Sequence, residues 1–409
     1  MNNIEQGPYP LQISDGLDFY KYTMSQLAQE KEPLARVRFD LKNRGENRLI
    51  DCVPLYVLQS RLDNIRKVGF QKNELSFLAG LKNGNGQVFS ENYLNMLSNA
   101  DLPPVNVGFD EKSGDIIITT TGNWSMATFW ETIVMSELNE LYFETYADIN
   151  NIDLNQLYQN GDDILSNKIA RLQTNSGIKI ADFGTRRHFS YRWQKHIVQR
   201  LARELPRQFI GTSNVGLASD LQLKPIGTFA HEMPMVYAAL ADKEGADIRT
   251  SHNEMLDDWF ERYGESLSIA LTDTFGSDFF FADFGAERAA AWNGVRHDSG
   301  DAIKFGEKVV SFYKDLDIDP KEKTIDFSDG LDINAIENLY NYFKDQVGIV
   351  FGWGTTLTND LGIKPLNIVM KATEVDGVKT VKLSDSVGKF TGTAKDIERY
   401  KDAFARITV

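Results

Sequence analysis

The chain has 409 residues, of which 42% are hydrophobic and 25% charged, a composition typical of a globular protein rather than a disordered or fibrous one. At about 150 residues per domain, this length predicts two or three structural units, one of which has room to be a barrel of roughly 250 residues. Acidic residues outnumber basic ones by 58 to 44, which gives a net charge of −14. Such an excess argues against nucleic acid or an anionic membrane as the main partner, because those surfaces need clustered lysine and arginine.

Cys52 is the single cysteine, which excludes an intrachain disulfide and a zinc site built from several cysteines. No apolar run approaches the roughly 18 residues of a membrane-spanning helix. The first residues lack the basic start and apolar stretch of a secretory signal. We therefore expect a cytoplasmic protein without a membrane partner.

The first 150 residues have the pattern of an α+β domain. Two of three strand-like segments are joined by a short turn at 110–115 that predicts a hairpin, and a helix from Thr128 to Tyr146 is expected to pack on the antiparallel sheet. The polar, asparagine-rich stretch 147–168 predicts a partly helical connector and a boundary near residue 150. The three predicted strands are Val37 to Leu41, Val105 to Phe109 and Ile116 to Thr121.

A different pattern covers residues 151–374. Short apolar strands alternate with helical patterns eight times, which predicts an α/β barrel or a doubly wound sheet. We expect this unit to carry the active site. The predicted strands are Lys179 to Phe183, Gln208 to Gly211, Lys224 to Gly227, Ser268 to Leu271, Ala291 to Val295, Thr324 to Phe327, Gly348 to Phe351 and Asn367 to Met370.

The last part of the chain returns to an antiparallel pattern. Val375-Asp376-Gly377-Val378 is a strong signal for a two-residue hairpin. We therefore expect residues 375–409 to complete the sheet domain formed by residues 1–150.

Small and polar residues follow nearly every predicted strand of 151–374. In a barrel these carboxyl ends converge on one face, where active sites of that architecture lie. A single cluster is explained by ordinary turn chemistry, whereas seven in corresponding positions favour a site. The clusters are 182–187, 211–214, 227–232, 272–274, 296–301, 328–332 and 352–356.

These clusters supply both arginines and aspartates. Arginine binds phosphate or carboxylate through forked hydrogen bonds, and aspartate binds Mg²⁺ or ribose hydroxyls, so the mixture predicts a sugar phosphate with a metal. Salt bridges between the loops are the alternative. The segment 352–355 follows the seventh predicted strand and presents backbone N–H groups without side-chain obstruction, as a phosphate site at that position requires. The main charged residues are Arg186, Arg187, Arg296, Asp273, Asp298, Asp301, Asp329 and Asp332.

His231 is the best placed of the five histidines for chemistry. It ends a predicted strand and precedes a predicted helix whose N-terminus favours an anion, with a capping or core role as the alternative. His196 and His252 lie in patterns typical of structural histidines. The chain has no GxxxxGK[ST], GxGxxG, HExxH or GxSxG motif, so P-loop, dinucleotide-binding, zincin and serine-hydrolase functions lose their usual support.

As a set, and in this order, several motifs resemble those of the nicotinate phosphoribosyltransferase family. With Asp18-Phe19-Tyr20 at the front, the resemblance covers nearly the whole chain. It implies an irregular, TIM-like α/β barrel plus an open α+β sheet domain formed from both chain ends. It also implies synthesis of nicotinate mononucleotide and pyrophosphate from nicotinate and 5-phosphoribosyl-1-pyrophosphate, coupled to ATP hydrolysis, in NAD salvage. The motifs are DFGTRR at 182–187, GTSN at 211–214, GTFAHE at 227–232, RHDSGD at 296–301, SDGLD at 328–332, FGWGT at 351–355, KPLNIVMK at 364–371 and KLSD at 382–385.

The resemblance implies that ATP, as co-substrate, transiently phosphorylates His231. Arg296 and Asp298 would act with it in catalysis, and Mg²⁺ would be held at Asp273 or Asp298. The residues expected to bind phosphoribosyl pyrophosphate are Asp329, Gly330, Gly352, Gly354 and Thr355.

The resemblance also implies a binding site for the base. Nicotinate would stack on Phe183 and pair with Arg186, near Thr228. Tyr20 resembles a tyrosine that family members supply to the neighbouring subunit, which implies a homodimer with a shared active site. The related nicotinamide enzyme carries an aspartate where this chain has Ser213. A neutral hydroxyl there does not repel the charge of nicotinate, so nicotinate is favoured over nicotinamide.

Three other functions stay open as alternatives: a nicotinamide phosphoribosyltransferase, a non-catalytic nucleotide-binding paralogue, and a lyase or isomerase acting on a sugar phosphate. A non-catalytic paralogue is expected to lose His231, Asp298 or Asp329, and all three are present. A lyase or isomerase needs a lysine or glutamate at a strand end to act as the base, and Lys371, at the last predicted strand, is the one obvious candidate. Glu131 fits a structural ion pair better.

Overall fold

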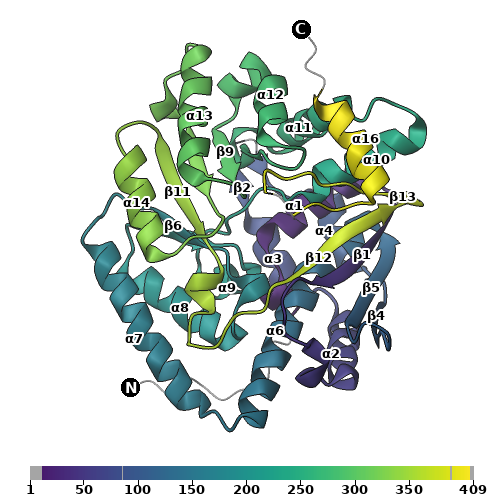
Figure 1. Cartoon of the computed structure of the whole chain (residues 1–409), viewed down its shortest axis with the longest axis vertical. Helices are drawn as coiled ribbons and strands as arrows, with labels where there is room; N and C mark the ends of the chain where they lie inside the picture. Colours follow the sequence, from purple (N-terminus) through teal and green to yellow (C-terminus); the bar gives the residue numbers. More distant parts are fainter. Residues whose placement is uncertain (1–11, 85, 387–388, 406–409) are drawn as a thin grey trace.

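The computed structural model describes residues 12–84, 86–386 and 389–405, and two sheets organise them (Figure 1). All neighbouring strands of the larger sheet are parallel, whereas those of the second sheet are antiparallel. In spatial order, the parallel sheet consists of β7 (Phe209–Thr212), β6 (Ile180–Asp182), β11 (Gly348–Trp353), β10 (Thr324–Phe327), β9 (Gly294–His297) and β8 (Ile269–Leu271). The antiparallel sheet consists of β13 (Val378–Lys379), β12 (Ile368–Val375), β1 (Arg36–Asn43), β5 (Ile116–Asn123) and β4 (Val105–Phe109). A short ribbon pairs β2 (Lys82–Asn83) with β3 (Gly86–Gln87).

Helices connect and cover the sheets. Several begin where the sequence offers a capping side chain, as at Asn214 and Asp332, whose side-chain oxygens accept hydrogen bonds from backbone N–H groups of the first turn. The helices are α1 (Phe19–Lys31), α2 (Leu55–Val68), α3 (Lys72–Gly80), α4 (Glu91–Ser98), α5 (Trp124–Ala127), α6 (Trp130–Ile149), α7 (Leu154–Gln173), α8 (Tyr191–Glu204), α9 (Val215–Leu221), α10 (Glu232–Glu244), α11 (Thr250–Tyr263), α12 (Ser277–Ala291), α13 (Ala302–Asp315), α14 (Ile333–Phe343), α15 (Thr355–Thr358) and α16 (Ala394–Ala405).

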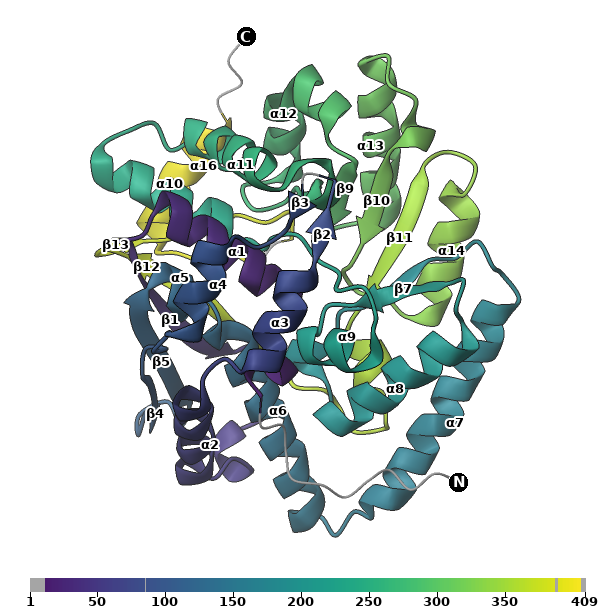
Figure 2. The ribbon, with the colours of Figure 1, turned by 180° about the vertical axis from the view of Figure 1, so that it is seen from behind.

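The parallel sheet confirms six of the eight strands predicted for residues 151–374, although β9 begins at Gly294 because Ala291 still belongs to α12. Helix α14 packs on β11, and α8 and α9 pack on β7 (Figure 2). The prediction of a strand at Lys224 to Gly227 was wrong: this segment makes an isolated bridge from Pro225 to Thr212. Proline has no N–H group to donate to a ladder, so a regular strand is disfavoured there.

The eighth predicted strand belongs to the other sheet. Residues Asn367 to Met370 lead into β12, which runs antiparallel to β1 and not alongside the parallel strands. Its residues are mostly buried and half-buried in alternation, as expected of an antiparallel strand. The count of eight strands in one parallel unit was therefore wrong, and the hydrogen-bonded ladder is a six-stranded sheet.

Both ends of the chain build the antiparallel sheet, since β12 near the C-terminal end pairs with β1 near the start. Strands β1, β4 and β5 lie where expected, and the hairpin between β12 and β13 turns at Asp376 and Gly377, both with positive φ as a type I′ turn requires. In Figure 1 the purple β1 and the yellow β12 lie side by side. The return begins at Ile368, seven residues before the predicted boundary.

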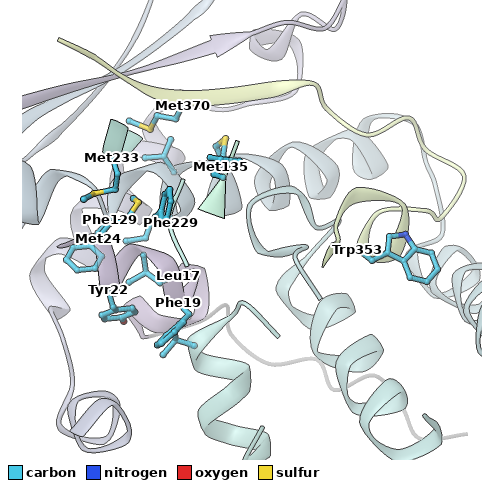
Figure 3. Packing of buried hydrophobic residues seen from close by; sticks show 14 of the residues in the cluster. Leu17, Phe19, Tyr22, Met24, Phe129, Met135, Phe229, Met233, Trp353 and Met370 are labelled. Atoms are coloured by element: carbon cyan, nitrogen blue, oxygen red, sulfur yellow. The ribbon is translucent and has the colours of Figure 1, made fainter. Parts of the chain in front are cut away.

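Helix α6 contacts both β12 and α2. Most of its residues are buried, including polar ones, as expected of a helix packed on all sides. Beside it, Met24, Phe129, Phe229 and Met233 gather from separate segments into one apolar core (Figure 3). No helix in the described part of the chain is long and apolar enough to cross a membrane.

Candidate active site

A cavity of about 400 Å³ opens between the carboxyl ends of the parallel strands, helix α6 and strand β12. Its walls therefore come from both sheets and not from the parallel unit alone. Most of the predicted site residues meet here. Those that line the cavity are Phe183, Arg186, His231, Arg296, Asp298, Asp329, Gly330, Gly352, Gly354 and Thr355.

His231 stands immediately before α10 and is held at both ring nitrogens. Nδ1 lies 2.9 Å from Thr274 Oγ1, and Nε2 lies 2.8 Å from Asp298 Oδ2 and 2.8 Å from Lys382 Nζ. Burial and the Lys382 ammonium lower the pKa of His231. The imidazole is therefore neutral near pH 7, with a ring nitrogen available as a nucleophile.

Two aspartates adjoin His231 and form the candidate metal site. Asp273 is almost fully buried: Oδ2 accepts a hydrogen bond from Ser299 Oγ at 2.6 Å, whereas Oδ1 has no hydrogen-bond partner among the described residues. Burial opposes ionisation of Asp298, but Arg296 and His231 hold its pKa well below the usual range. The ligand atoms of His231, Asp273 and Asp298 all lie within 4.8 Å of one another. The unpaired oxygen and the ionised neighbour fit a cation's ligand set.

The base side of the cavity is built from Phe183 and Arg186, which follow β6. The Phe183 ring lies against Gly352 so closely that a Cβ at position 352 would come within 2.3 Å of it. Arg186 Nη1 donates to Glu131 Oε1 at 3.0 Å, from helix α6. An aromatic face and an arginine fork therefore open into the same cavity, a combination that suits a flat anionic ring.

The cavity is also lined by residues expected to bind the phosphoribosyl group. Gly354 and Thr355 line it at the end of β11, and Asp329 lies 3.0 Å from Lys389 Nζ. The backbone N–H of Gly352, which was expected to be offered to a phosphate, donates to the buried Asp326 at 3.1 Å. The missing side chain at Gly352 instead makes room for the Phe183 ring.

Three predicted base-site residues do not line the cavity. Ser213 is buried and its hydroxyl donates to Asp18 Oδ1 at 2.6 Å, while Thr228 Oγ1 donates to the Ile269 carbonyl at 2.9 Å. The Tyr20 hydroxyl is buried and has no hydrogen-bond partner among the described residues. Ser213 and Thr228 therefore do not reach the cavity wall. Tyr20 does not line the cavity either, but it is an electrostatic neighbour of Arg186.

Two family models match the chain and together cover most of it. Residues 17–139 match the nicotinate phosphoribosyltransferase N-terminal domain, and residues 178–406 match the nicotinate phosphoribosyltransferase family. The chain belongs to the nicotinate phosphoribosyltransferase family.

Solved structures of nicotinate phosphoribosyltransferases are also similar to this chain. The nicotinate phosphoribosyltransferase from Porphyromonas gingivalis is 27% identical, with a TM-score of 0.85 over 97% of this chain and 100% of its own. The nicotinate phosphoribosyltransferase from Vibrio cholerae is 30% identical, with a TM-score of 0.85 over 100% of this chain and 97% of its own.

The sequence patterns gave no role to several residues that line the cavity of this family member. Lys382 could have been found from the KLSD motif at 382–385, whereas Arg44 gave no local signal. Lys371 is half-buried and donates to Thr391 Oγ1 at 2.5 Å, and its partial burial lowers its pKa to about 7. Glu131 forms the expected ion pairs but also lines the cavity.

Proposed function

We propose that this chain transfers the phosphoribosyl group of 5-phosphoribosyl-1-pyrophosphate to nicotinate, forming nicotinate mononucleotide and pyrophosphate in NAD salvage. We further propose that ATP hydrolysis is coupled to this reaction through a phosphohistidine at His231. The observation that carries the proposal is the convergence of His231 and Asp298 with Phe183 and Arg186 on one cavity, in a chain that matches the family over most of its length.

The transfer breaks the bond between the anomeric carbon and the pyrophosphate oxygen and forms a bond to the pyridine nitrogen. That nitrogen carries its own lone pair and needs no general base. Stacking on Phe183 and pairing with Arg186 would place it for attack. Arg296 and Lys382 would stabilise the charge that grows on the leaving pyrophosphate, and Asp298 would tolerate the cationic sugar.

Phosphorylation of His231 would join a ring nitrogen to the γ-phosphorus of ATP as the bond to the ADP oxygen breaks. The neutral imidazole has the lone pair that this step needs, and Thr274 and Asp298 orient it. Water would later release inorganic phosphate. Lys382, at 2.8 Å from Nε2, is placed to stabilise the incoming phosphoryl group.

Asp273 and Asp298 would hold Mg²⁺, which when bound neutralises phosphate charge and orients the pyrophosphate. We also propose a cytoplasmic homodimer in which Tyr20 contributes to the partner's site. The segment 224–228 contacts both β7 and β8, through Pro225 and Thr228, and would complete an irregular barrel.

The test combines γ-labelled ATP and Mg²⁺ with the purified chain, followed by phosphoribosyl pyrophosphate and either nicotinate or nicotinamide. Acid-labile label on protein and mononucleotide from nicotinate are expected, with the label lost in His231→Ala. His196→Ala is the matched control, because His196 pairs with Asp162 away from the cavity. Product from nicotinamide alone would establish the alternative substrate, and no product from either base would favour a non-catalytic nucleotide-binding protein.

A further inference from the structure

Lys21 is a fully buried charge that does not line the cavity. It lies on helix α1, and its ammonium contacts Glu131 Oε2 at 2.5 Å and Glu232 Oε2 at 2.6 Å. Thr128 Oγ1 accepts a further hydrogen bond at 3.2 Å. Burying a lysine this completely is costly unless its charge is matched, so the two carboxylates account for its presence.

Glu131 connects Lys21 to the base site. One of its oxygens contacts the Lys21 ammonium and the other accepts from Arg186 Nη1 at 3.0 Å, and its side chain lines the cavity. Burial alone would favour a neutral carboxyl, but Lys21 and Arg186 lower the pKa of Glu131, so it is ionised. An anion therefore stands beside the arginine that is proposed to receive the nicotinate carboxylate.

This arrangement poses an electrostatic difficulty for an anionic substrate. A carboxylate beside Arg186 both competes for its guanidinium and repels a second carboxylate. With Lys21 present, the charges of Lys21, Arg186, Glu131 and Glu232 sum to zero before the substrate binds. Without Lys21 the same group carries one net negative charge.

We propose that Lys21 is a specificity-determining residue for the base. Its ammonium neutralises the negative charge of Glu131 at the carboxylate oxygen that does not contact Arg186, and this allows an anionic pyridine carboxylate to bind at Arg186. Lys21 does not touch the substrate and acts through Glu131. The proposal rests on the proposed function, in which Arg186 pairs with the carboxylate of nicotinate.

Removing Lys21 should affect the Glu131 carboxylate more than the Glu232 carboxylate. Glu232 Oε1 also accepts from Trp124 Nε1 at 2.6 Å, and its Oε2 from Thr128 Oγ1 at 3.0 Å. Glu232 therefore keeps two neutral donors when the ammonium is removed. Glu131 would turn fully to Arg186 and compete with nicotinate there.

The test compares steady-state kinetics of the wild type with Lys21→Met. We expect the KM for nicotinate to rise about tenfold, while the KM for phosphoribosyl pyrophosphate and the inhibition constant of uncharged nicotinamide change less than about threefold. Lys21→Met/Glu131→Gln, which removes both charges, should bring the nicotinate KM back to within about threefold of wild type. Lys21→Arg, which keeps the charge, should resemble wild type.

Glu144→Gln is the matched control, since Glu144 lies on α6, as Glu131 does, and pairs with Arg61. If Lys21→Met does not fold, Lys21→Gln keeps a donor to Glu131 without the charge and carries the same expectation. A fall in kcat with an unchanged nicotinate KM would show a purely structural role and overturn the proposal, as would equal weakening of nicotinate and nicotinamide. Absence of product from the wild type would instead refute the proposed function.

Discussion

Replacing Gly352 by alanine separates two roles for this residue, one steric and one in phosphate binding. The new Cβ would lie 2.3 Å from Cε2 and 2.4 Å from Cδ2 of the Phe183 ring. Carbon atoms in contact are about 3.5 Å apart or more, so the ring or the strand must shift by about 1 Å. The backbone of Gly352 does not have a positive φ, so the effect is steric and not conformational.

Overpacking of this kind costs about 1–3 kcal/mol in the free energy of unfolding. Because Phe183 is proposed to stack on the base, a displacement of about 1 Å there should lower kcat/KM for nicotinate by about 100-fold. The KM for phosphoribosyl pyrophosphate should stay within about threefold, since the Gly352 N–H is already given to Asp326. Gly80→Ala, which meets nothing within 4 Å, is the control.

The assay is mononucleotide formation with each substrate varied in turn, together with urea unfolding of both variants. A raised KM for phosphoribosyl pyrophosphate with unchanged nicotinate kinetics would refute the steric reasoning. In that case position 352 would require glycine because of phosphate binding, and not because of the Phe183 ring.

Two further predictions concern stability. Lys371 has a folded-state pKa of about 7, below the usual 10.4 or so, so the unfolded chain binds more protons between these values and stability rises with pH across them. Lys371→Met should therefore be more stable than wild type by about 2–4 kcal/mol at pH 7 in urea unfolding. This difference in the free energy of unfolding should narrow towards pH 10. A difference that does not change with pH would contradict the lowered pKa of Lys371. Gly294→Ala places a Cβ 1.9 Å from the Thr324 carbonyl oxygen, so it should separate β9 from β10 and cost more than about 3 kcal/mol, measured by denaturant midpoint or soluble yield.

One side of the cavity was accessible from the sequence because its signals are local. An apolar strand followed at once by polar residues needs only a few neighbouring positions to be recognised, and this pattern located Phe183, Arg186 and Asp298. Parallel strands then bring their carboxyl ends to one edge, so strand ends that are far apart in the chain could be expected to meet.

The other side depends on pairings that no local pattern specifies. Lys371 reaches the cavity because β12 pairs with β1, where it lies opposite Asp40. The short apolar run that leads into β12 is compatible with either sheet, and it was assigned to the wrong one. Glu131 lies in a buried helix whose polar residues resemble ordinary ion-pairing positions until the fold brings Arg186 beside it.

The cavity walls are predominantly basic, although the protein as a whole is acidic. The protein carries a net charge of −14, yet the cavity walls carry seven basic side chains against four acidic ones. Because water and salt screen buried charges less than exposed ones, this local excess attracts a polyanionic substrate more effectively than the overall field repels it. The basic residues come from both sheets, so the site is complete only when the two chain ends have joined. The seven are Arg44, Arg186, Arg187, Arg296, Lys371, Lys382 and Lys389, and the four are Glu131, Glu232, Asp298 and Asp329.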